Sequence, residues 1–317
     1  MKKIIFILAV FSFSIANTFS QIDTIWTVGG LSTLTFNQNS LTNWASGGEN
    51  SFSGNAFINL YANYNFEKSS WDNMIMLNYG VVTANDNQDI RKNNDRMELN
   101  SKYGRYAFGK FYYAGLVNFL SQFRPGYDYI VDPEATTPIS DFLAPGYLTL
   151  SAGLDYKPTE YFSLYLSPAT GKFTFVMDPY IAALGTYGNT PGVIDSLGNI
   201  VTDGDSFRSE FGASLIATLS VDLAPKFNTT GKLTLFNNFT DPIKKNRGNI
   251  DVNFYNTFSY ALGKLFTLSL YLEVIYDHDI IIPIYNDANV QIDEGPRTQF
   301  KEIFGIGLSY TIGDKLE

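Results

Sequence analysis

Polar and apolar residues alternate along most of this chain, in runs longer than a typical globular strand. Between Phe52 and Phe66, apolar residues dominate the even positions, whereas asparagine recurs at the odd ones. Successive side chains of a β-strand point to opposite faces, so this pattern predicts a strand with one apolar and one polar face. Runs of roughly 11 to 15 residues exceed the globular average of about 5–6 and suit strands that cross a membrane. The pattern therefore predicts an all-β fold, a transmembrane antiparallel β-barrel.

The same alternation can be followed through the whole chain. It predicts strands over Trp26–Phe36, Phe52–Phe66, Trp71–Thr83, Arg96–Phe108, Lys110–Phe123, Tyr147–Tyr156, Tyr161–Tyr187, Phe207–Asp222, Gly231–Phe239, Ile250–Leu262, Phe266–Asp277 and Gln299–Tyr310. Pro168–Gly171 interrupts the seventh of these, which indicates a turn or a bulge there. Counting that segment as one strand gives a barrel of about 12 strands. An overlooked strand would make 14 the alternative.

Connection lengths predict the orientation of the barrel. Short turns are expected near Glu67, Gly109, Pro158, Pro225 and Gly263, and long loops near Asn43, Asn87, Asp132, Asn199, Lys245 and Asp287. Outer-membrane barrels have short periplasmic turns and longer extracellular loops. Strict alternation of the two kinds places both ends of the barrel in the periplasm.

The first twenty residues have the features of an export signal. Lys2 and Lys3 precede an apolar run, Ile4–Phe13, and small residues follow at Thr18–Ser20. The run is too short to span a bilayer as a helix. We therefore expect a signal peptide over residues 1–20, a barrel domain over residues 21–317, and a location in the bacterial outer membrane.

Composition supports this class and excludes others. The chain has 26 Phe, 21 Tyr and 26 Gly with modest hydropathy, which suits a wall between lipid and water better than the alternative of a soluble β-protein. Its net charge of −9 would fall further once Lys2 and Lys3 are removed, so nucleic acid is not an expected partner. With no cysteine there are no disulfides. No phosphate-binding loop or zinc-ligand spacing is present, and we expect no cofactor.

Charged residues on the polar faces are the candidate lumen-lining residues. They are Glu98, Lys102, Asp155, Arg208, Glu210, Asp222, Glu273, Asp277 and Lys301. Several of them must approach one another across a narrow interior. One interpretation is an ion-pair network that packs the lumen, and another is a polar lining for a solute path. A catalytic pair of carboxylates remains a third, although no spacing selects any two residues.

Other candidate chemistry lies near the strand ends. The single histidine, His278, would be a general base only if a neighbouring strand supplied a serine, because Ile280 takes the position two residues on. Acidic residues in the outer loops have calcium-type oxygen ligands but no known calcium spacing, so no metal site is assigned. Basic clusters at Arg91–Lys92 and Lys244–Arg247 could bind lipopolysaccharide phosphates.

Several segments resemble a known family. They include LTNWASGGENS, RKNNDR, NSKYG, QFRPGYDY, ISDFLAPGYLTLSAGLDYKP, YLSPATGKFTFV, RSEFGA, YDHDI and QFKEIFGIGLSY. These are similar to the uncharacterised family called domain of unknown function 3078. The resemblance implies a secreted outer-membrane β-barrel protein of Gram-negative bacteria, and it implies no activity or functional residues.

The sequence thus predicts a barrel whose role stays open between three functions. The first is a channel or transport-related barrel for small polar solutes, motivated by the charged inner face. The second is a non-conducting surface or assembly protein that binds a partner through its extracellular loops. The third is an outer-membrane lipid hydrolase that uses His278. An enzyme is the least supported of the three, and the lipid and lipopolysaccharide of the outer membrane are the expected surroundings.

Overall fold

A computed structural model describes residues 25–39, 51–84, 90–129, 132, 134–263, 265–286 and 291–312. The predicted signal peptide at residues 1–20 lies outside the described residues, as do Asn43, Asn87 and Asp287 at the predicted loops. Among the residues that the structure describes, no helix is long and apolar enough to cross a membrane.

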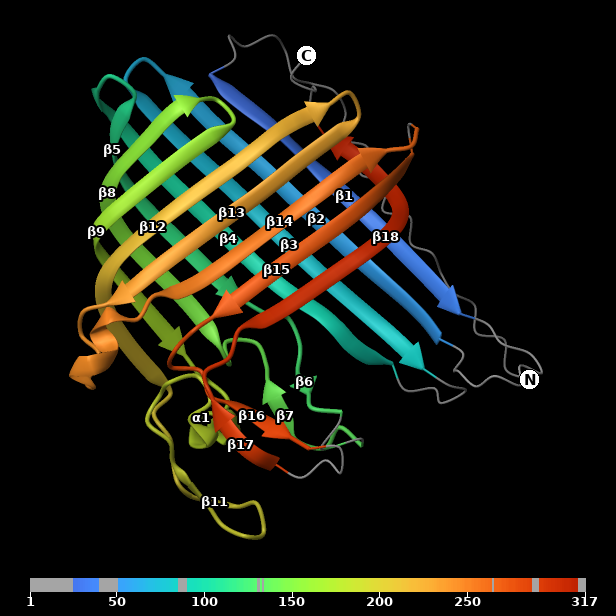
Figure 1. Ribbon diagram of the computed structural model, residues 1–317, viewed down its shortest axis with the longest axis vertical. Helices are drawn as coiled ribbons and strands as arrows, with labels where there is room; N and C mark the ends of the chain where they lie inside the picture. The colour runs from blue at the N-terminus through green and yellow to red at the C-terminus, as the bar shows by residue number, and fades with distance from the viewer. Residues whose placement is uncertain are drawn as a thin grey trace.

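Twelve antiparallel strands close into a barrel (Figure 1). They are β1 (Trp26–Asn39), β2 (Ser51–Phe66), β3 (Ser69–Ala84), β4 (Arg91–Phe108), β5 (Phe111–Ser121), β8 (Gly146–Thr159), β9 (Phe162–Phe175), β12 (Phe207–Ala224), β13 (Phe227–Asn238), β14 (Asp251–Ala261), β15 (Phe266–Tyr276) and β18 (Gln299–Ile312). Each strand pairs with the barrel strands next to it along the chain. The first and last pair with each other, with Leu34 opposite Leu308. The predicted count of about 12 is confirmed, and the alternative of 14 is wrong.

Most strand boundaries differ from the prediction by a few residues, and two of the differences change the interpretation. β4 begins at Arg91 rather than Arg96, so Arg91 and Lys92 lie on a strand and not in an outer loop. The predicted strand Tyr161–Tyr187 ends at Phe175, and a short helix, α1 (Pro179–Leu184), follows it. Asp178 caps that helix by accepting a hydrogen bond from the Ile181 amide. The capped start of α1 therefore marks the end of this strand. The alternation of apolar residues continues past it and does not show where the strand ends.

The interruption at Pro168 is a β-bulge inside β9. Opposite it the register shifts on both neighbouring strands, between Ala152 and Leu154 on β8 and between Gly212 and Ser214 on β12. Before the bulge the inward side chains take odd positions, as at Ser167, and after it they take even ones, as at Thr170. One extra residue in a strand has this effect because the side-chain period is two.

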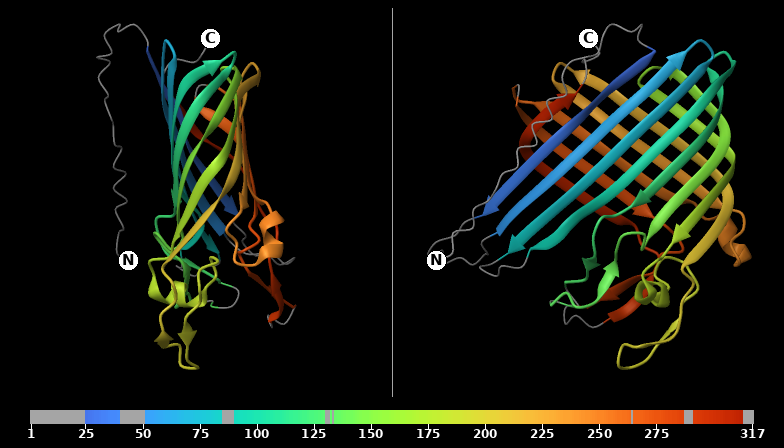
Figure 2. Two further views of the ribbon diagram at one scale, coloured as in Figure 1. Left: turned by 90° about the vertical axis from the view of Figure 1, so that its left-hand side faces the viewer. Right: turned by 180° about the vertical axis from the view of Figure 1, so that it is seen from behind.

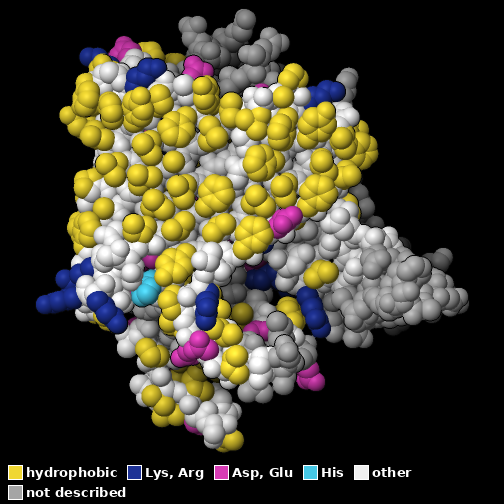
Figure 3. All heavy atoms as spheres, in the orientation of Figure 1, with side chains coloured by type: hydrophobic (Ala, Val, Ile, Leu, Met, Phe, Trp, Pro, Cys, Tyr) yellow, Lys and Arg dark blue, Asp and Glu magenta, His cyan; other side chains and the backbone are white. Residues whose placement is uncertain are grey.

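The outer wall of the barrel is apolar and its inner face is polar. Large apolar side chains remain exposed around the wall, for example Tyr113, Phe300 and Phe304. Figure 3 shows them as a continuous band, with charged side chains gathered beyond its two ends. Buried positions instead hold Glu98, Asp155 and many serines and threonines. This inversion of a soluble protein is the arrangement of a transmembrane barrel.

The two ends of the barrel are built differently. Tight turns join the strands at one end, with left-handed residues at Glu67, Gly109 and Lys226. We call this the short-turn end and the opposite one the long-loop end. The long loops carry three small hairpins, β6 (Gly126–Tyr127) with β7 (Pro138–Ser140), β10 (Val193–Ile194) with β11 (Ile200–Thr202), and β16 (Ile282–Tyr285) with β17 (Gln291–Gly295). They also carry α1 and a 3-10 helix, η1 (Lys244–Gly248).

The barrel is flattened, with a broad face in Figure 1 and a narrow one in the left view of Figure 2. One broad wall contains β12 to β15 and β18, and β1 to β4 lie behind it. Side chains from the two broad walls can therefore meet across the short dimension of the interior.

Candidate functional site: the barrel interior

Several ion pairs join strands that are not neighbours in the sheet, and these contacts cross the interior; others join them into groups. We divide them into three groups by their positions along the strands. The short-turn group is Asp72, Lys102, Asp155 and Lys157; the middle group is Arg96, Glu98, Lys232, Glu273 and Lys301; the long-loop group is Lys172, Arg208, Glu210, Asp251, Asp277 and Asp279. Together they hold seven basic and eight acidic residues, so the charges of the interior nearly cancel.

The short-turn group lies close to the hairpins at Glu67 and Glu160. Lys102 Nζ is 2.7 Å from Asp155 Oδ2, and both side chains are at least nine-tenths buried. The Ser163 hydroxyl connects them, since it donates to Asp155 at 2.5 Å and accepts from Lys102 at 2.7 Å. Lys157 reaches Asp72 at 2.6 Å, although β4 and β5 lie between their strands. This group therefore connects β3, β4 and β8 along one side of the interior.

The middle group crosses the full interior. Arg96 on β4 places Nη1 2.6 Å from Glu273 Oε1 on β15 and Nη2 2.7 Å from Glu98 Oε2 on its own strand. The other oxygen of Glu98 accepts from Lys232 on β13 at 2.6 Å. Both carboxylates are thus held by two cationic partners, the arrangement that makes a buried charge tolerable. Lys301 completes the group, with Nζ 2.9 Å from Glu273.

Aromatic side chains pack beside the middle group. The Arg96 guanidinium lies over the Tyr255 ring at 5.2 Å, and Tyr255 stacks on Tyr271 at 6.5 Å. Met76 from the facing wall packs against the two tyrosines in one buried cluster. An apolar contact therefore crosses the interior next to the charged one.

The long-loop group is centred on Lys172, just beyond the bulge of β9. Its ammonium lies 3.0 Å from Asp251 and 3.1 Å from Asp277. Arg208 pairs with Glu210 at 3.0 Å and with Asp279. Four carboxylates face two cations here, so this end of the interior carries an excess of negative charge.

Folded loop segments cover the long-loop end. We call residues 138–145 and 176–206 the loop cap. Its small core consists of Ala144, Val176, Ile181 and Ala182, with Tyr187 packed against it. The Tyr187 hydroxyl donates to Ile139 O at 3.0 Å, and Asn189 bonds to Ala182 O and Asp205 O. Burial raises the pKa of the Tyr187 hydroxyl, so it stays a neutral donor. The loop cap is therefore a packed unit with its own core.

A cavity of about 50 Å³ lies inside the barrel, next to the aromatic cluster of the middle group. It is lined by Leu31, Thr33, Thr35, Asn55, Phe57, Asn78, Thr257, Ser259, Ser269, Tyr271, Ile303 and Gly305. These residues come from β1, β2 and β3 on one wall and from β14, β15 and β18 on the other. None of them is charged.

The nine predicted lumen-lining residues do not all lie together. Eight take part in the three groups. The ninth, Asp222, is exposed near the short-turn end and accepts a hydrogen bond from Asn228 at 3.0 Å. Asp222 shares its strand face with Glu210 but lies beyond the packed part of the interior.

The sequence prediction missed seven of the fifteen residues in the three groups. They are Asp72, Arg96, Lys157, Lys172, Lys232, Asp251 and Asp279. Alternation would have placed Arg96 on the same face as Glu98, and Lys232 likewise lies within a predicted strand. Lys172 was hidden by the bulge, because the change of parity there moves it to the inner face.

Within the described part of the chain, His278 has two hydrogen-bond partners and neither is a serine. Its Nδ1 lies 3.1 Å from the Tyr276 hydroxyl, and its amide donates to Asp251. Within the described residues no group of three histidine, cysteine, aspartate or glutamate residues is arranged to hold a metal ion. Lys92, expected in a free basic loop cluster, instead pairs with Asp95 at 3.0 Å.

Solved structures with a similar course of the chain are outer-membrane proteins. An outer membrane channel from Pseudomonas putida F1 is 13% identical, covering 93% of this chain and 98% of that one, with a TM-score of 0.37. The translocator domain of the autotransporter NalP from Neisseria meningitidis is 9% identical, covering 92% and 90%, with a TM-score of 0.34. The outer membrane channel DcaP of Acinetobacter baumannii is 8% identical, covering 91% and 95%, with a TM-score of 0.28. Likeness at this level carries no argument about activity.

A search of curated proteins finds no match. The model of one protein family matches residues 36–127, from β1 to β6. Its description is protein of unknown function (DUF3078). The resemblance in the sequence is thereby confirmed over those residues: this twelve-stranded transmembrane barrel carries a DUF3078 match.

Proposed function

We propose that the protein is a channel for small polar solutes in the bacterial outer membrane, and that ion pairs close its interior in the described conformation. The signal peptide at residues 1–20 would export it, and residues 21–317 would form one barrel domain. The short-turn end would then face the periplasm, as in barrels of this class.

The observation that carries the proposal is the position of Lys301. Its Nζ lies 3.3 Å from Asn94 Oδ1 on β4, across the interior, yet 40% of its side chain is exposed. Solvent therefore reaches Lys301, a member of the middle group, on the inner face of the barrel. Its partner Glu273 is only 4% exposed. The solvent-accessible part of the interior therefore ends between these two side chains.

Planar bilayers test the proposal. Purified protein should give small conductance steps, and the double variant Glu98→Gln, Glu273→Gln should give larger ones, because it weakens the ion pairs that cross the interior. Asp222→Asn is the matched control, since Asp222 is exposed and lies outside the three groups. If the folded wild type and the double variant are both silent, the channel proposal is overturned.

A second candidate follows from a different observation. The three ion-pair groups and the loop cap together fill much of the path through the barrel, which suits a non-conducting barrel that presents its loops to a partner. The absence of conductance steps in the bilayer experiment would favour this non-conducting barrel. Deletion of β10 and β11 from the loop cap should then abolish partner binding while the barrel still folds. No contact of His278 favours a hydrolase.

Lipopolysaccharide is a proposed neighbour at the long-loop end. Lys244 and Lys245 are exposed on η1, between Ile243 and Ile250, which are exposed as well. Ammonium groups beside apolar side chains match a phosphorylated lipid headgroup above its acyl chains.

A further inference from the structure

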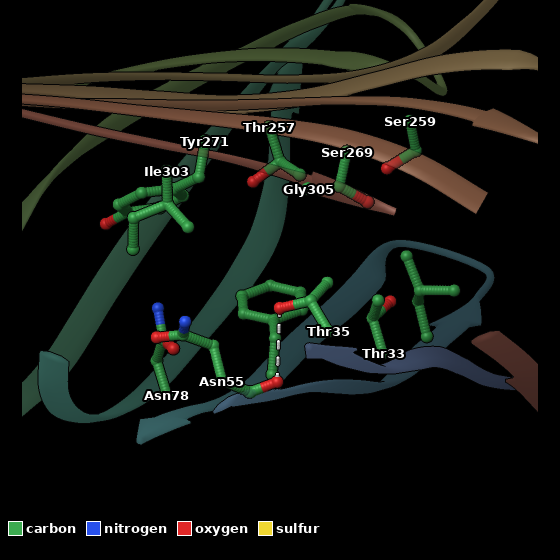
Figure 4. A pocket seen from close by; sticks show the side chains of 12 residues that line it. Thr33, Thr35, Asn55, Asn78, Thr257, Ser259, Ser269, Tyr271, Ile303 and Gly305 are labelled. Atoms are coloured by element: carbon green, nitrogen blue, oxygen red, sulfur yellow. Dashed lines mark hydrogen bonds between the residues drawn. The ribbon is translucent and has the colours of Figure 1, made fainter. Parts of the chain in front are cut away.

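The uncharged cavity of the interior has the chemistry of a site for a small neutral polyol. Thr33 and Thr35 rise from one wall, and Thr257, Ser259 and Ser269 face them from the other (Figure 4). Phe57, Tyr271 and Ile303 add apolar surface to the lining. A polyol carries both hydroxyl groups and apolar carbon. The hydroxyls of this lining can hydrogen-bond to the first, and its apolar side chains can contact the second.

Three buried polar atoms of residues that line this cavity lack a hydrogen-bond partner: Thr33 Oγ1, Asn55 Oδ1 and Tyr271 Oη. Thr33 is 7% exposed, Asn55 is 8% exposed and Tyr271 is 6% exposed. An unsatisfied buried polar atom costs free energy, so such atoms are uncommon without a ligand or water. The Thr35 hydroxyl, by contrast, bonds to Asn55 O at 3.4 Å.

No charged side chain lines the cavity. The nearest charged residues on the inner face, Glu273 and Lys301, pair with each other two positions from Tyr271 and Ile303. An anion or cation entering the cavity would lose its hydration without meeting a counter-charge, which is costly. A neutral solute avoids this cost.

The volume of the cavity limits the size of the solute that it can hold. A buried water needs roughly 10–15 Å³ of such space, so a cavity of about 50 Å³ holds only a few waters or a compact solute of similar extent. This volume suits a short-chain polyol better than a disaccharide.

We propose that this cavity binds small neutral polyols of the size of glycerol on their way through the barrel; the inference rests on the proposed channel function. Swelling of proteoliposomes in glycerol, in glycerate and in a disaccharide measures the selectivity. Swelling should be fast in glycerol, slow in glycerate and absent in the disaccharide.

Single substitutions connect the flux to the cavity. Thr33→Val and Ser269→Ala should each slow glycerol entry by roughly two- to tenfold, the effect of losing one hydrogen bond. Thr33→Val removes an unpartnered hydroxyl and should not lower stability, so slower entry could not be ascribed to misfolding. Thr218→Val on the inner face of β12 is the matched control, because Thr218 does not line the cavity.

The outcomes separate the two proposals. Normal conductance with glycerol entry unchanged in Thr33→Val would overturn the polyol site and leave the channel standing. Faster water flow with glycerol excluded would also overturn it, because the cavity would then hold water only. Absence of both conductance and swelling would overturn the channel and the polyol site together.

Discussion

Lys232 on β13 donates a 2.6 Å hydrogen bond to Glu98 on β4, although four strands separate them on the shorter way round the barrel. This contact and the Arg96–Glu273 pair tie the two broad walls together through the interior. The interior thus contributes to the stability of the barrel as well as to any path through it.

Removing Glu98 should destabilise the barrel strongly. In Glu98→Ala, Lys232 and Arg96 lose a buried carboxylate partner, and breaking a buried pair from one side costs roughly 3–5 kcal/mol. Urea unfolding in detergent, followed by circular dichroism, measures the change. Asp222→Ala, an exposed position on a neighbouring part of the inner face, should stay within about 0.5 kcal/mol of wild type. Equal losses in both variants would contradict the importance of the middle group.

Lys301→Met should increase the conductance of the channel and shift its reversal potential towards cations. The variant removes the half-exposed ammonium that bridges Glu273 and Asn94, and Glu273 keeps its negative charge. Single-channel recording in a salt gradient measures both effects. Lys68→Met, an exposed short-turn position, is the control and should change neither. An unchanged reversal potential would show that ions do not pass Lys301.

The β10–β11 hairpin should open in acid. Asp195 Oδ1 accepts from the amides of Leu197 at 2.9 Å and Asn199 at 2.8 Å. The Asn199 and Leu197 hydrogen bonds lower the pKa of Asp195 below its usual value of 3.8. A lowered pKa gives stability that is complete above 3.8 and is lost as the pH falls through the folded-state pKa. Pepsin cleavage near Leu197 should therefore accelerate below that range. Asp195→Asn should be cleaved readily even above it; equal rates at all pH values would contradict the role of Asp195.

Cysteine labelling can determine the orientation, because the chain has no cysteine. Leu197 is 85% exposed at the long-loop end, whereas Glu160 is exposed at a short turn. On intact cells a membrane-impermeant maleimide should label Leu197→Cys and leave Glu160→Cys unlabelled. The reverse pattern would place the long loops in the periplasm.

Replacing Lys244 and Lys245 by alanine should reduce the lipopolysaccharide that copurifies with the protein. Two ammonium groups are lost at the edge of the apolar wall, where headgroup phosphates would lie. Phosphate analysis of the purified protein measures the bound lipid. Removing Lys68 and Arg105 at the short-turn end gives the same change in charge and should leave the amount unaltered. Equal losses in the two double variants would mean that the basic residues act without regard to position.

The sequence predicted the barrel well because period-two alternation is a local property. Each strand except β9 shows it nearly from end to end, and the short turns follow their own residue preferences. The interior was predicted only in part. Alternation can place Glu98 and Lys232 on inner faces, but it does not tell which residues face each other across a flattened barrel. That depends on strand tilt and register, which arise from the closure of the whole sheet.

The loop cap shows a different limit. Its core forms between segments as far apart as Ala144 and Ile181, and each contributes only a few apolar residues. No periodic pattern marks such a short segment, so the packing of the loops could not be predicted. The cavity was missed for a similar reason, since Thr33 and Ser269 are ordinary inner-face hydroxyls until the two walls are brought together.

The bulge in β9 also determines which side chains of the strand face the interior and which face lipid. Deleting Ala169 would restore strict alternation from Phe162 to Phe175, and it would rotate Lys172 out of the interior and into lipid. Near the end of the strand a lysine on the lipid face costs only about 0–1 kcal/mol, so the main loss would be the cation that Asp251 and Asp277 share. A strand without the bulge would therefore be less stable, because the extra residue is what turns Lys172 towards its two carboxylate partners.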